Sequence, residues 1–233
     1  MVEYLLGIKE LDDLIGGIRE GTNLMLIGPP MCGKDDLLNK IVHTGLKNNE
    51  ASIIVSTRET GERVLEWFSL NDLDLENANI GIVDCVTKTL GIPTQDLDMI
   101  KRAASPVDLT GIGVRMGQYL EEFLVQRESI GLRLCINSLS TILMYSNLQT
   151  VFRFLHVYTG RVKAAKAFGI FVVEDETHDP QTVATLKQLF DGMIEIKETD
   201  SGYAIRVLGI TQKPTKWYDF EIDGTDVNIL STE

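Results

Sequence analysis

Residues 28–35 read Gly-Pro-Pro-Met-Cys-Gly-Lys-Asp and match the pattern G-x-x-x-x-G-K of a phosphate-binding loop. In such a loop the glycines let backbone N–H groups fold around phosphate oxygens, and the lysine reaches the outer phosphates. A Ser or Thr after the lysine then ligates magnesium. Gly28, Gly33 and Lys34 supply all but the last part, because Asp35 stands where the hydroxyl should be. The stretch therefore predicts a phosphate cradle with an altered metal position.

The residues on either side of the loop support this interpretation. Residues 23–27 form an apolar run that ends at Gly28, and residues 36–42 resume with helical spacing of apolar side chains, which predicts strand, loop and helix. A helix that starts near Gly33 directs its positive end at an anion. We expect the following residues to surround the ligand: Gly28, Met31, Cys32, Gly33, Lys34, Asp35 and Asp36.

Apolar runs alternate with amphipathic segments along the rest of the chain. This alternation is typical of an α/β fold with a mainly parallel, twisted sheet flanked by helices. The further strands are expected at 51–57, 79–84, 132–137 and 169–173, and the further helices at 61–70, 117–130 and 148–168, with Gly160 as a point of interruption.

Two regions depart from this alternation. Residues 86–113 are rich in Thr, Pro, Asp and Gly, and we expect a long loop there with a helical turn at 99–103. The last part of the chain predicts strands joined by turns, which would extend the sheet in antiparallel fashion. These strands are expected at 192–197, 203–210, 217–222 and 227–230. No repeat or linker marks a boundary, so residues 1–233 are expected to form a single domain.

Composition narrows the class of protein. The chain has 233 residues, of which 44% are hydrophobic and 24% charged, and no apolar stretch approaches the roughly 18 residues of a membrane span. Its first residues lack a secretion signal, so we expect a cytoplasmic protein without a membrane partner. The net charge of −12 argues against nucleic acid as a partner. The three cysteines and three histidines show no metal-binding spacing and are interpreted as structural.

Residues 6–21 carry a more specific signal. They read Leu-Gly-Ile-Lys-Glu-Leu-Asp-Asp-Leu-Ile-Gly-Gly-Ile-Arg-Glu-Gly and closely resemble the segment that precedes the first core strand in the RecA superfamily. The resemblance is strongest to the archaeal relatives of the circadian-clock ATPase KaiC, and it extends more weakly over nearly the whole chain. It implies a RecA-type fold, ATP or ADP as the ligand, and homo-oligomers with nucleotide near the subunit boundaries. The AAA+ class shares the letters G-P-P-x-x-G-K but ends in a helical lid, whereas this chain ends in predicted strands.

The resemblance also shows where the chemistry departs from the family, because both the Walker A and the Walker B motif are degenerate. Asn137, followed by Ser138, stands where the family has a metal-binding aspartate. After the strand at 51–57 the family often has two glutamates, and here Arg58 and Glu59 stand in their place. Glu59 is thus the one remaining candidate for a catalytic base. The family's trans-acting cations near the C-terminus are replaced as well, with Lys213 or Lys216 as candidate substitutes.

Asp35 and Asn137 admit two interpretations. They are either decay at a metal site no longer used, or an exchange in which a hydroxyl plus a carboxylate has become a carboxylate plus an amide. A carboxylate about 4 Å from a phosphate charge costs on the order of 4 kcal/mol at an effective dielectric of 20, unless Lys34 or another cation intervenes. We therefore expect Asp35 to weaken nucleotide binding without metal and to make binding steeply dependent on Mg²⁺.

Arg58 also admits two uses, as a structural residue or as a contact to a terminal phosphate.

The leading hypothesis is a KaiC-like regulator that binds ATP or ADP with weak or absent hydrolysis and acts through protein partners. One alternative is an active Mg²⁺-dependent ATPase that uses Asp35 for metal and Glu59 for water. Another is a recombination-type DNA-binding ATPase. The sequence is also compatible with a protein that binds no nucleotide.

Overall fold

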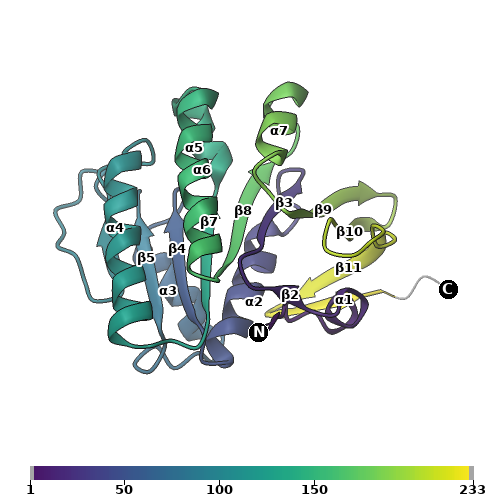
Figure 1. Cartoon of the computed structure of the whole chain (residues 1–233), viewed down its shortest axis with the longest axis horizontal. Helices are drawn as coiled ribbons and strands as arrows, with labels where there is room; N and C mark the ends of the chain where they lie inside the picture. Colours follow the sequence, from purple (N-terminus) through teal and green to yellow (C-terminus); the bar gives the residue numbers. More distant parts are fainter. Residues whose placement is uncertain (1–2, 231–233) are drawn as a thin grey trace.

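A large sheet forms the centre of the protein in a computed structural model that describes residues 3–230 (Figure 1). Its strand order is β12-β11-β10-β9-β3-β8-β7-β4-β5-β6. The strands, in chain order, are β3 (Asn23–Gly28), β4 (Ala51–Ser56), β5 (Ile80–Asp84), β6 (Ile100–Arg102), β7 (Leu132–Asn137), β8 (Phe168–Glu174), β9 (Gly192–Thr199), β10 (Gly202–Leu208), β11 (Tyr218–Asp223) and β12 (Asp226–Ile229). A small antiparallel pair, β1 (Glu3–Tyr4) and β2 (Ile18–Arg19), stands apart from it.

The sheet divides into a parallel and an antiparallel part. Strands β9, β3, β8, β7, β4, β5 and β6 pair in parallel, whereas β10, β11 and β12 are added in antiparallel fashion beyond β9. Strand β3 lies between β8 and β9, where Leu26 is opposite Val172 on one side and Ile194 on the other. Because it is covered on both faces, β3 is buried throughout, which explains its continuous apolar sequence. The predicted fold class is confirmed.

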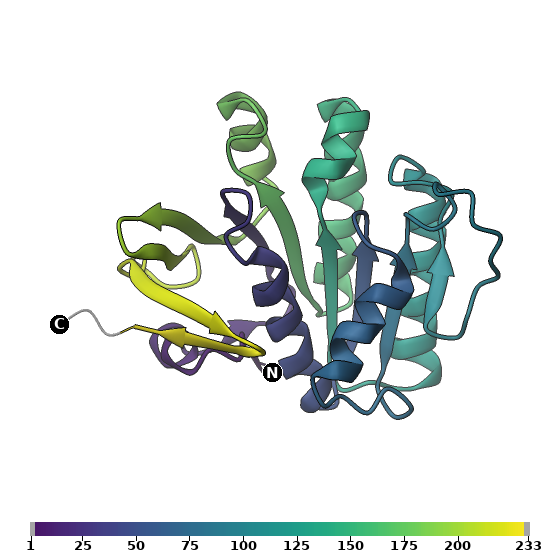
Figure 2. The ribbon, with the colours of Figure 1, turned by 180° about the vertical axis from the view of Figure 1, so that it is seen from behind.

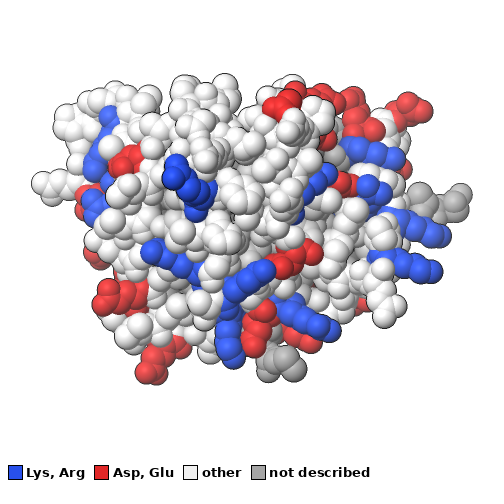
Figure 3. Space-filling view, turned by 45° about the horizontal axis from the view of Figure 1, so that its top comes forward, with Lys and Arg blue, Asp and Glu red and all other residues white. Residues whose placement is uncertain are grey.

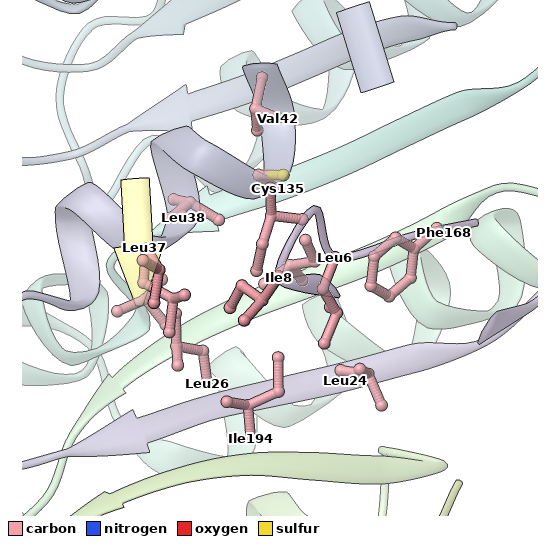
Figure 4. Close-up of a cluster of buried hydrophobic side chains, with 14 of the residues drawn as sticks. Leu6, Ile8, Leu24, Leu26, Leu37, Leu38, Val42, Cys135, Phe168 and Ile194 are labelled. Atoms are coloured by element: carbon pink, nitrogen blue, oxygen red, sulfur yellow. The ribbon is translucent and has the colours of Figure 1, made fainter. Parts of the chain in front are cut away.

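Helices cover both faces of the sheet. On one face lie α2 (Lys34–Lys47) and α3 (Gly61–Leu70), which are in front in Figure 2. On the other lie α4 (Leu109–Glu121), α5 (Leu139–Tyr145), α6 (Leu148–Ala164) and α7 (Pro180–Lys187) (Figure 1). Each face has its own cluster of buried apolar side chains. Figure 4 shows part of the first, where Leu37 of α2 lies beside Leu26 of β3. The short helix α1 (Lys9–Ile15) buries Leu11 and Ile15 in the same cluster.

Several expected elements were wrong or missed. The helical turn expected at 99–103 is strand β6, which pairs with β5 and buries Ile100 against the backbone of Gly61. The expected helix at 117–130 begins earlier, at Leu109, where Asp108 caps it by accepting a hydrogen bond from Gly111 N at 2.9 Å. It ends in a π-helical turn, η1 (Glu122–Gln126). Helices α5 and α7 were not anticipated, because both are short.

The long helix α6 ends earlier than expected and is not interrupted. Gly160 lies inside it, and a Cβ there would have no atom within 4 Å, so this glycine is not a packing requirement. Residues 165–167 then turn the chain into β8, with Lys166 at a φ of 54°. Residues 165–168, expected to be helical, therefore belong to a turn and to the start of a strand.

No helix within residues 3–230 combines the length and the apolar character that crossing a bilayer requires.

Candidate phosphate-binding site

The loop after β3 has the backbone shape that its glycines predict. Strand β3 ends at Gly28 and α2 begins at Lys34, so residues 29–33 connect them. Gly33 has a φ of 79°, a left-handed conformation that glycine adopts without steric cost. A Cβ at Gly33 would also lie 2.5 Å from Ile222 Cδ1 on β11. The loop therefore requires glycine here for both its conformation and its contact with the C-terminal strands.

Lys34 is buried and points back into the loop. Its Nζ donates to the carbonyl oxygens of Gly28, at 3.0 Å, and of Pro29. It also lies 2.8 Å from Glu174 Oε2 and 3.5 Å from Cys32 Sγ. Its side chain is 3% exposed and that of Glu174 13% exposed, so the pair is shielded from water. The lysine that should face a phosphate is neutralised by a carboxylate of the same chain.

A second cation, Arg58, continues this set of contacts. Its Nη1 donates to Glu174 Oε1 at 2.8 Å, and its Nη2 donates to Asp35 Oδ2. The other oxygen of Asp35 accepts a hydrogen bond from Asn137 Nδ2 at 2.8 Å. Lys34, Glu174, Arg58, Asp35 and Asn137 thus form one connected charge network, named here the cradle network.

The sheet order explains why these residues meet. Asn137 ends β7, Glu174 ends β8, and Arg58 follows β4 after one intervening residue. These strands are parallel neighbours, and their C-terminal ends point to the top in Figure 2, where α2 begins. Ligands in open α/β sheets bind at the carboxyl ends of the strands. The cradle network lies at that edge.

Glu174 was missed in the sequence, although a signal for it existed. It directly follows the apolar run 169–173, and a charged residue at the end of a buried parallel strand marks the ligand edge of the sheet. Its contact with Lys34 could not be anticipated, because the two residues are joined by strand pairing rather than by proximity in the sequence.

Glu59, the candidate base, lies near the network and is exposed. Its backbone carbonyl accepts a hydrogen bond from Ser56 Oγ at 2.6 Å. With Asp35, Arg58 and Asn137 it lines a small cavity of about 30 Å³, which is room for about one water molecule. The structure thus brings the candidate base and the candidate metal residues together.

Two larger cavities meet at the loop. One of about 280 Å³ is the cradle itself, lined among others by Lys34, Arg58 and Glu174. The other, of about 770 Å³, extends from the loop to the C-terminal strands and is lined in part by Trp67, Tyr203 and Phe220. Both cavities share the following residues: Met31, Cys32, Gly33 and Asp36. The two cavities therefore adjoin at this stretch of the loop, one with a polar lining and the other with a partly aromatic lining.

Burial raises the pKa of two residues in the wall that these cavities share. It raises the pKa of the Cys32 thiol, an effect that Lys34 only partly offsets, so the thiol stays protonated at neutral pH and is a poor nucleophile. Burial, followed by the neighbouring charge of Asp35, also raises the pKa of Asp36. Met31 is 93% exposed and adopts a φ of 60°, so its side chain does not enclose a ligand in this conformation.

The residues at the metal position do not fit magnesium as they are folded. Mg²⁺ takes oxygen ligands in octahedral geometry, but the Asp35 carboxylate is already paired with the positive Arg58 guanidinium, which repels a cation at that oxygen, and its other oxygen accepts the Asn137 N–H. Asn137 turns its amide N–H toward Asp35, and only its Oδ1, which is buried without a hydrogen-bond partner in the described chain, is left as an acceptor. Within residues 3–230, no group of three or more His, Cys, Asp or Glu residues is placed to hold a metal ion.

The surface around this edge is not strongly basic. Figure 3 shows Lys and Arg side chains dispersed among uncharged and acidic residues, without a continuous basic band on the face in view. A backbone-binding surface for nucleic acid would need such a band.

Comparison with known proteins supports the fold. The crystal structure of the uncharacterized protein PH0321 from Pyrococcus horikoshii, in complex with an unknown peptide, is similar with a TM-score of 0.71 and 18% identity, over 97% of this chain and 98% of that one. The KaiC-like protein PH0186 from Pyrococcus horikoshii OT3 is similar with a TM-score of 0.69 and 17% identity, over 99% of both chains. These likenesses establish a KaiC-like, RecA-type fold.

Sequence comparison places the chain among its relatives. No curated protein matches it. Residues 21–196, which include the loop, Arg58, Asn137 and Glu174, match a family described as a family of unknown function (DUF7504). The chain belongs to this family, DUF7504.

Proposed function

We propose that this protein binds a nucleotide, ATP or ADP, at the loop 28–36 and hydrolyses it slowly or not at all. We further propose that a bound nucleotide changes how the protein interacts with a protein partner. One observation carries the proposal: Glu174 neutralises the loop lysine, and Arg58 and Asn137 take up the carboxylate of Asp35. The loop has the backbone conformation that holds phosphates, whereas Asp35 and Asn137, the candidate metal residues, are engaged with each other and with Arg58.

Nucleotide as the ligand is supported by the two adjoining cavities. The polar cavity of about 280 Å³ offers loop amides, Lys34 and Arg58 to phosphates. The adjoining cavity of about 770 Å³ is lined in part by Trp67 and Tyr203, two half-buried aromatic side chains that a flat base could contact. Ligand sites are usually concave and partly apolar, with a few converging polar groups, and this space has that character.

Slow or absent hydrolysis follows from what the cradle network lacks. Phosphoryl transfer to water needs a bridging metal, a carboxylate that orients the water, and cations for the developing charge. Loss of a base and loss of charge stabilisation each reduce the rate by about 10²-fold or more. Together they predict a rate on the order of 10⁴-fold below that of an intact site.

A protein partner and self-association complete the proposal. PH0321 has the same fold and was crystallised with a peptide, which is a precedent for peptide binding on this architecture. KaiC-like proteins commonly form oligomers, so we propose that this chain also forms a homo-oligomer. A single RecA-like domain over residues 1–233 and a cytoplasmic location belong to the same proposal.

Calorimetric titration with ATP and ADP, combined with phosphate-release measurements, tests this function. We expect binding to the wild type, at least tenfold weaker binding to Lys34→Ala, and turnover near background. Lys47→Ala is the matched control, because this lysine is exposed in the last turn of the same helix. Failure to bind either nucleotide would contradict the proposal, and so would fast turnover that Lys34→Ala abolishes.

An active ATPase is the second candidate, and the small cavity beside Glu59 favours it, because Glu59 and Asp35 both line it and it has room for about one water. The double variant Asp35→Ser with Asn137→Asp distinguishes between the two interpretations of the altered metal position, decay and exchange. A gain in hydrolysis indicates decay of an ordinary metal site, and a loss of existing hydrolysis indicates that carboxylate and amide have exchanged roles.

A further inference from the structure

We propose that the loop takes its phosphate ligand without a divalent metal, and that the Arg58 guanidinium supplies the positive charge that magnesium supplies in other phosphate loops. The inference rests on the proposed function, since it concerns how the same site holds a nucleotide. It departs from the expectation that Asp35 makes binding steeply dependent on Mg²⁺, because in the structure the Arg58 guanidinium compensates the charge of Asp35.

The first step concerns the position of the cation. Other phosphate loops hold magnesium with the residue after the lysine, and that residue here is Asp35. Arg58 Nη2 donates to Asp35 Oδ2, so a positive group already lies on the oxygen that would face a metal. Asn137 occupies the other oxygen through its N–H at 2.8 Å, and an N–H group does not ligate a metal.

The second step concerns the position of the phosphate. Glu174 accepts from Arg58 Nη1 with one oxygen at 2.8 Å and lies 2.8 Å from Lys34 Nζ with the other. Two oxygens of one anion therefore bridge two cations, which is what a phosphate group in the cradle would do. We interpret the Glu174 carboxylate as an internal occupant of the phosphate position.

The third step concerns charge and access. The network holds two cations, Lys34 and Arg58, and two carboxylates, Asp35 and Glu174, so it is neutral before a ligand arrives. When phosphate displaces Glu174, Lys34 and Arg58 both face the ligand, and the charge of Asp35 stays compensated. Arg58 is 38% exposed and so is accessible from solvent. Its planar, weakly hydrated guanidinium suits bidentate contact with phosphate oxygens.

The test is calorimetric titration of the purified full chain with ADP and with ATP, in EDTA and in excess magnesium. Inorganic pyrophosphate is titrated in the same buffers to separate a phosphate requirement from a base requirement. We expect affinities for the nucleotides in EDTA to be within about threefold of those in magnesium, or tighter. Pyrophosphate that binds as tightly as ADP would extend the ligand class to polyphosphates without a base, and weaker binding would restrict it to nucleotides.

Arg58→Ala should weaken nucleotide binding in EDTA at least about tenfold and make the remaining binding dependent on magnesium, whereas Arg58→Lys should retain part of the metal-free affinity. Arg63→Ala is the matched control, since this arginine is 70% exposed on α3 and pairs only loosely with Glu66 at 3.8 Å. Circular dichroism of each variant verifies folding.

Glu174→Gln tests the same inference from the other side and does not depend on the stability of the Arg58 variants. Removal of the competing carboxylate should raise nucleotide affinity in EDTA about tenfold or more, while Glu176→Gln, exposed two residues further on, should leave it unchanged. Wild-type binding that requires magnesium would overturn the metal-free inference and leave the proposed function intact. Absence of binding in both buffers would overturn both.

Discussion

The position of Glu174 shows how a side chain outside a sequence motif engages the lysine of that motif. Its carboxylate contacts Lys34 and Arg58, and it is only 13% exposed, so both contacts operate with reduced screening by water. Under the proposed function, a phosphate ligand must replace these contacts before it gains its own. The internal ion pair would then lower the affinity of the loop for that ligand.

A second buried pair acts on stability rather than on binding. Arg133 is fully buried; its Nε donates to Glu50 Oε2 at 2.6 Å, and its Nη1 donates to the carbonyl oxygens of Leu5 and Ile41 at 2.8 and 2.7 Å. We predict that Arg133→Met lowers the free energy of unfolding by about 3–5 kcal/mol, because it leaves Glu50 charged and unpaired in the interior. Urea unfolding measures this change.

The double variant Arg133→Met with Glu50→Gln should recover a large part of the loss, since no uncompensated charge is left. Arg127→Met is the control: the Arg127–Glu122 pair is half exposed and should contribute at most about 1 kcal/mol. A loss for Arg133→Met no greater than for this control would contradict the role of the buried pair.

Among the elements, the C-terminal end of β5 is connected by one side chain to β6, the strand that stands in place of the expected helical turn. Asp84 is fully buried and accepts hydrogen bonds from Gly61 N at 3.1 Å, at the start of α3, and from Val86 N at 2.8 Å. It also accepts from Thr87 Oγ1 and lies 3.5 Å from Arg102 Nε on β6. A single carboxylate thereby connects two strands, a helix and the loop that follows.

The pKa of Asp84 predicts how this corner responds to acid. Burial acts to raise it, but the hydrogen bonds from Thr87, Gly61 and Val86 outweigh burial and hold the pKa below its ordinary value. A lowered pKa in the folded state means that Asp84 contributes stability above its unfolded pKa of about 3.9 and loses this contribution as pH falls through the folded pKa. We predict that Asp84→Asn costs about 2 kcal/mol at pH 7 and progressively less below about pH 4.

Urea unfolding of the wild type and Asp84→Asn at neutral and acid pH measures this difference. Asp200→Asn, an exposed aspartate in the turn between β9 and β10, should change stability little at either pH. An Asp84→Asn cost that stays constant down to pH 3 would show that the carboxylate charge is not involved.

The whole molecule has a net charge of −12, whereas the cradle network, with two cations and two carboxylates, is neutral. The overall field opposes polyanions, so under the proposed function an anionic ligand would gain its affinity locally, from the loop amides and from Lys34 and Arg58 released from their partners. A long nucleic acid would extend beyond this edge onto a surface whose net charge is negative. The net charge therefore agrees better with the proposed small phosphate ligand than with nucleic acid.

Ligand binding should be visible as thermal stabilisation of the entire chain. Nucleotide at about 100 times its Kd adds about 2.7 kcal/mol to the folded state, which for a chain of this size corresponds to a rise in Tm of roughly 5–10 °C. We predict this shift for ADP with the wild type and its loss in Lys34→Ala. Single-stranded DNA at low salt should give no shift, and a shift with DNA that equals that of ADP would reverse the assignment of the ligand.

Short-range patterns in the sequence are sufficient to predict the local features: the strand–loop–helix around residues 23–42, most buried strands of the parallel sheet and the C-terminal hairpins. These follow from glycine conformations and apolar periodicity, which act over a few residues. The sequence also indicates Asp35, Arg58 and Asn137 as altered positions and Glu59 as the remaining candidate base, and the structure brings the four to one edge of the sheet. Their roles in binding and catalysis are still predictions.

Only the tertiary structure decided which of these groups touch. The contact of Glu174 with Lys34, the engagement of Asp35 by Arg58 and Asn137, and strand β6 in place of a helical turn all depend on which strand ends become neighbours. The cavity between the loop and Tyr203 likewise arises from residues far apart in the chain. Strand order is a non-local property, because it is selected by the packing of the whole sheet, and a charge at a strand end acquires its partner only when that order is complete.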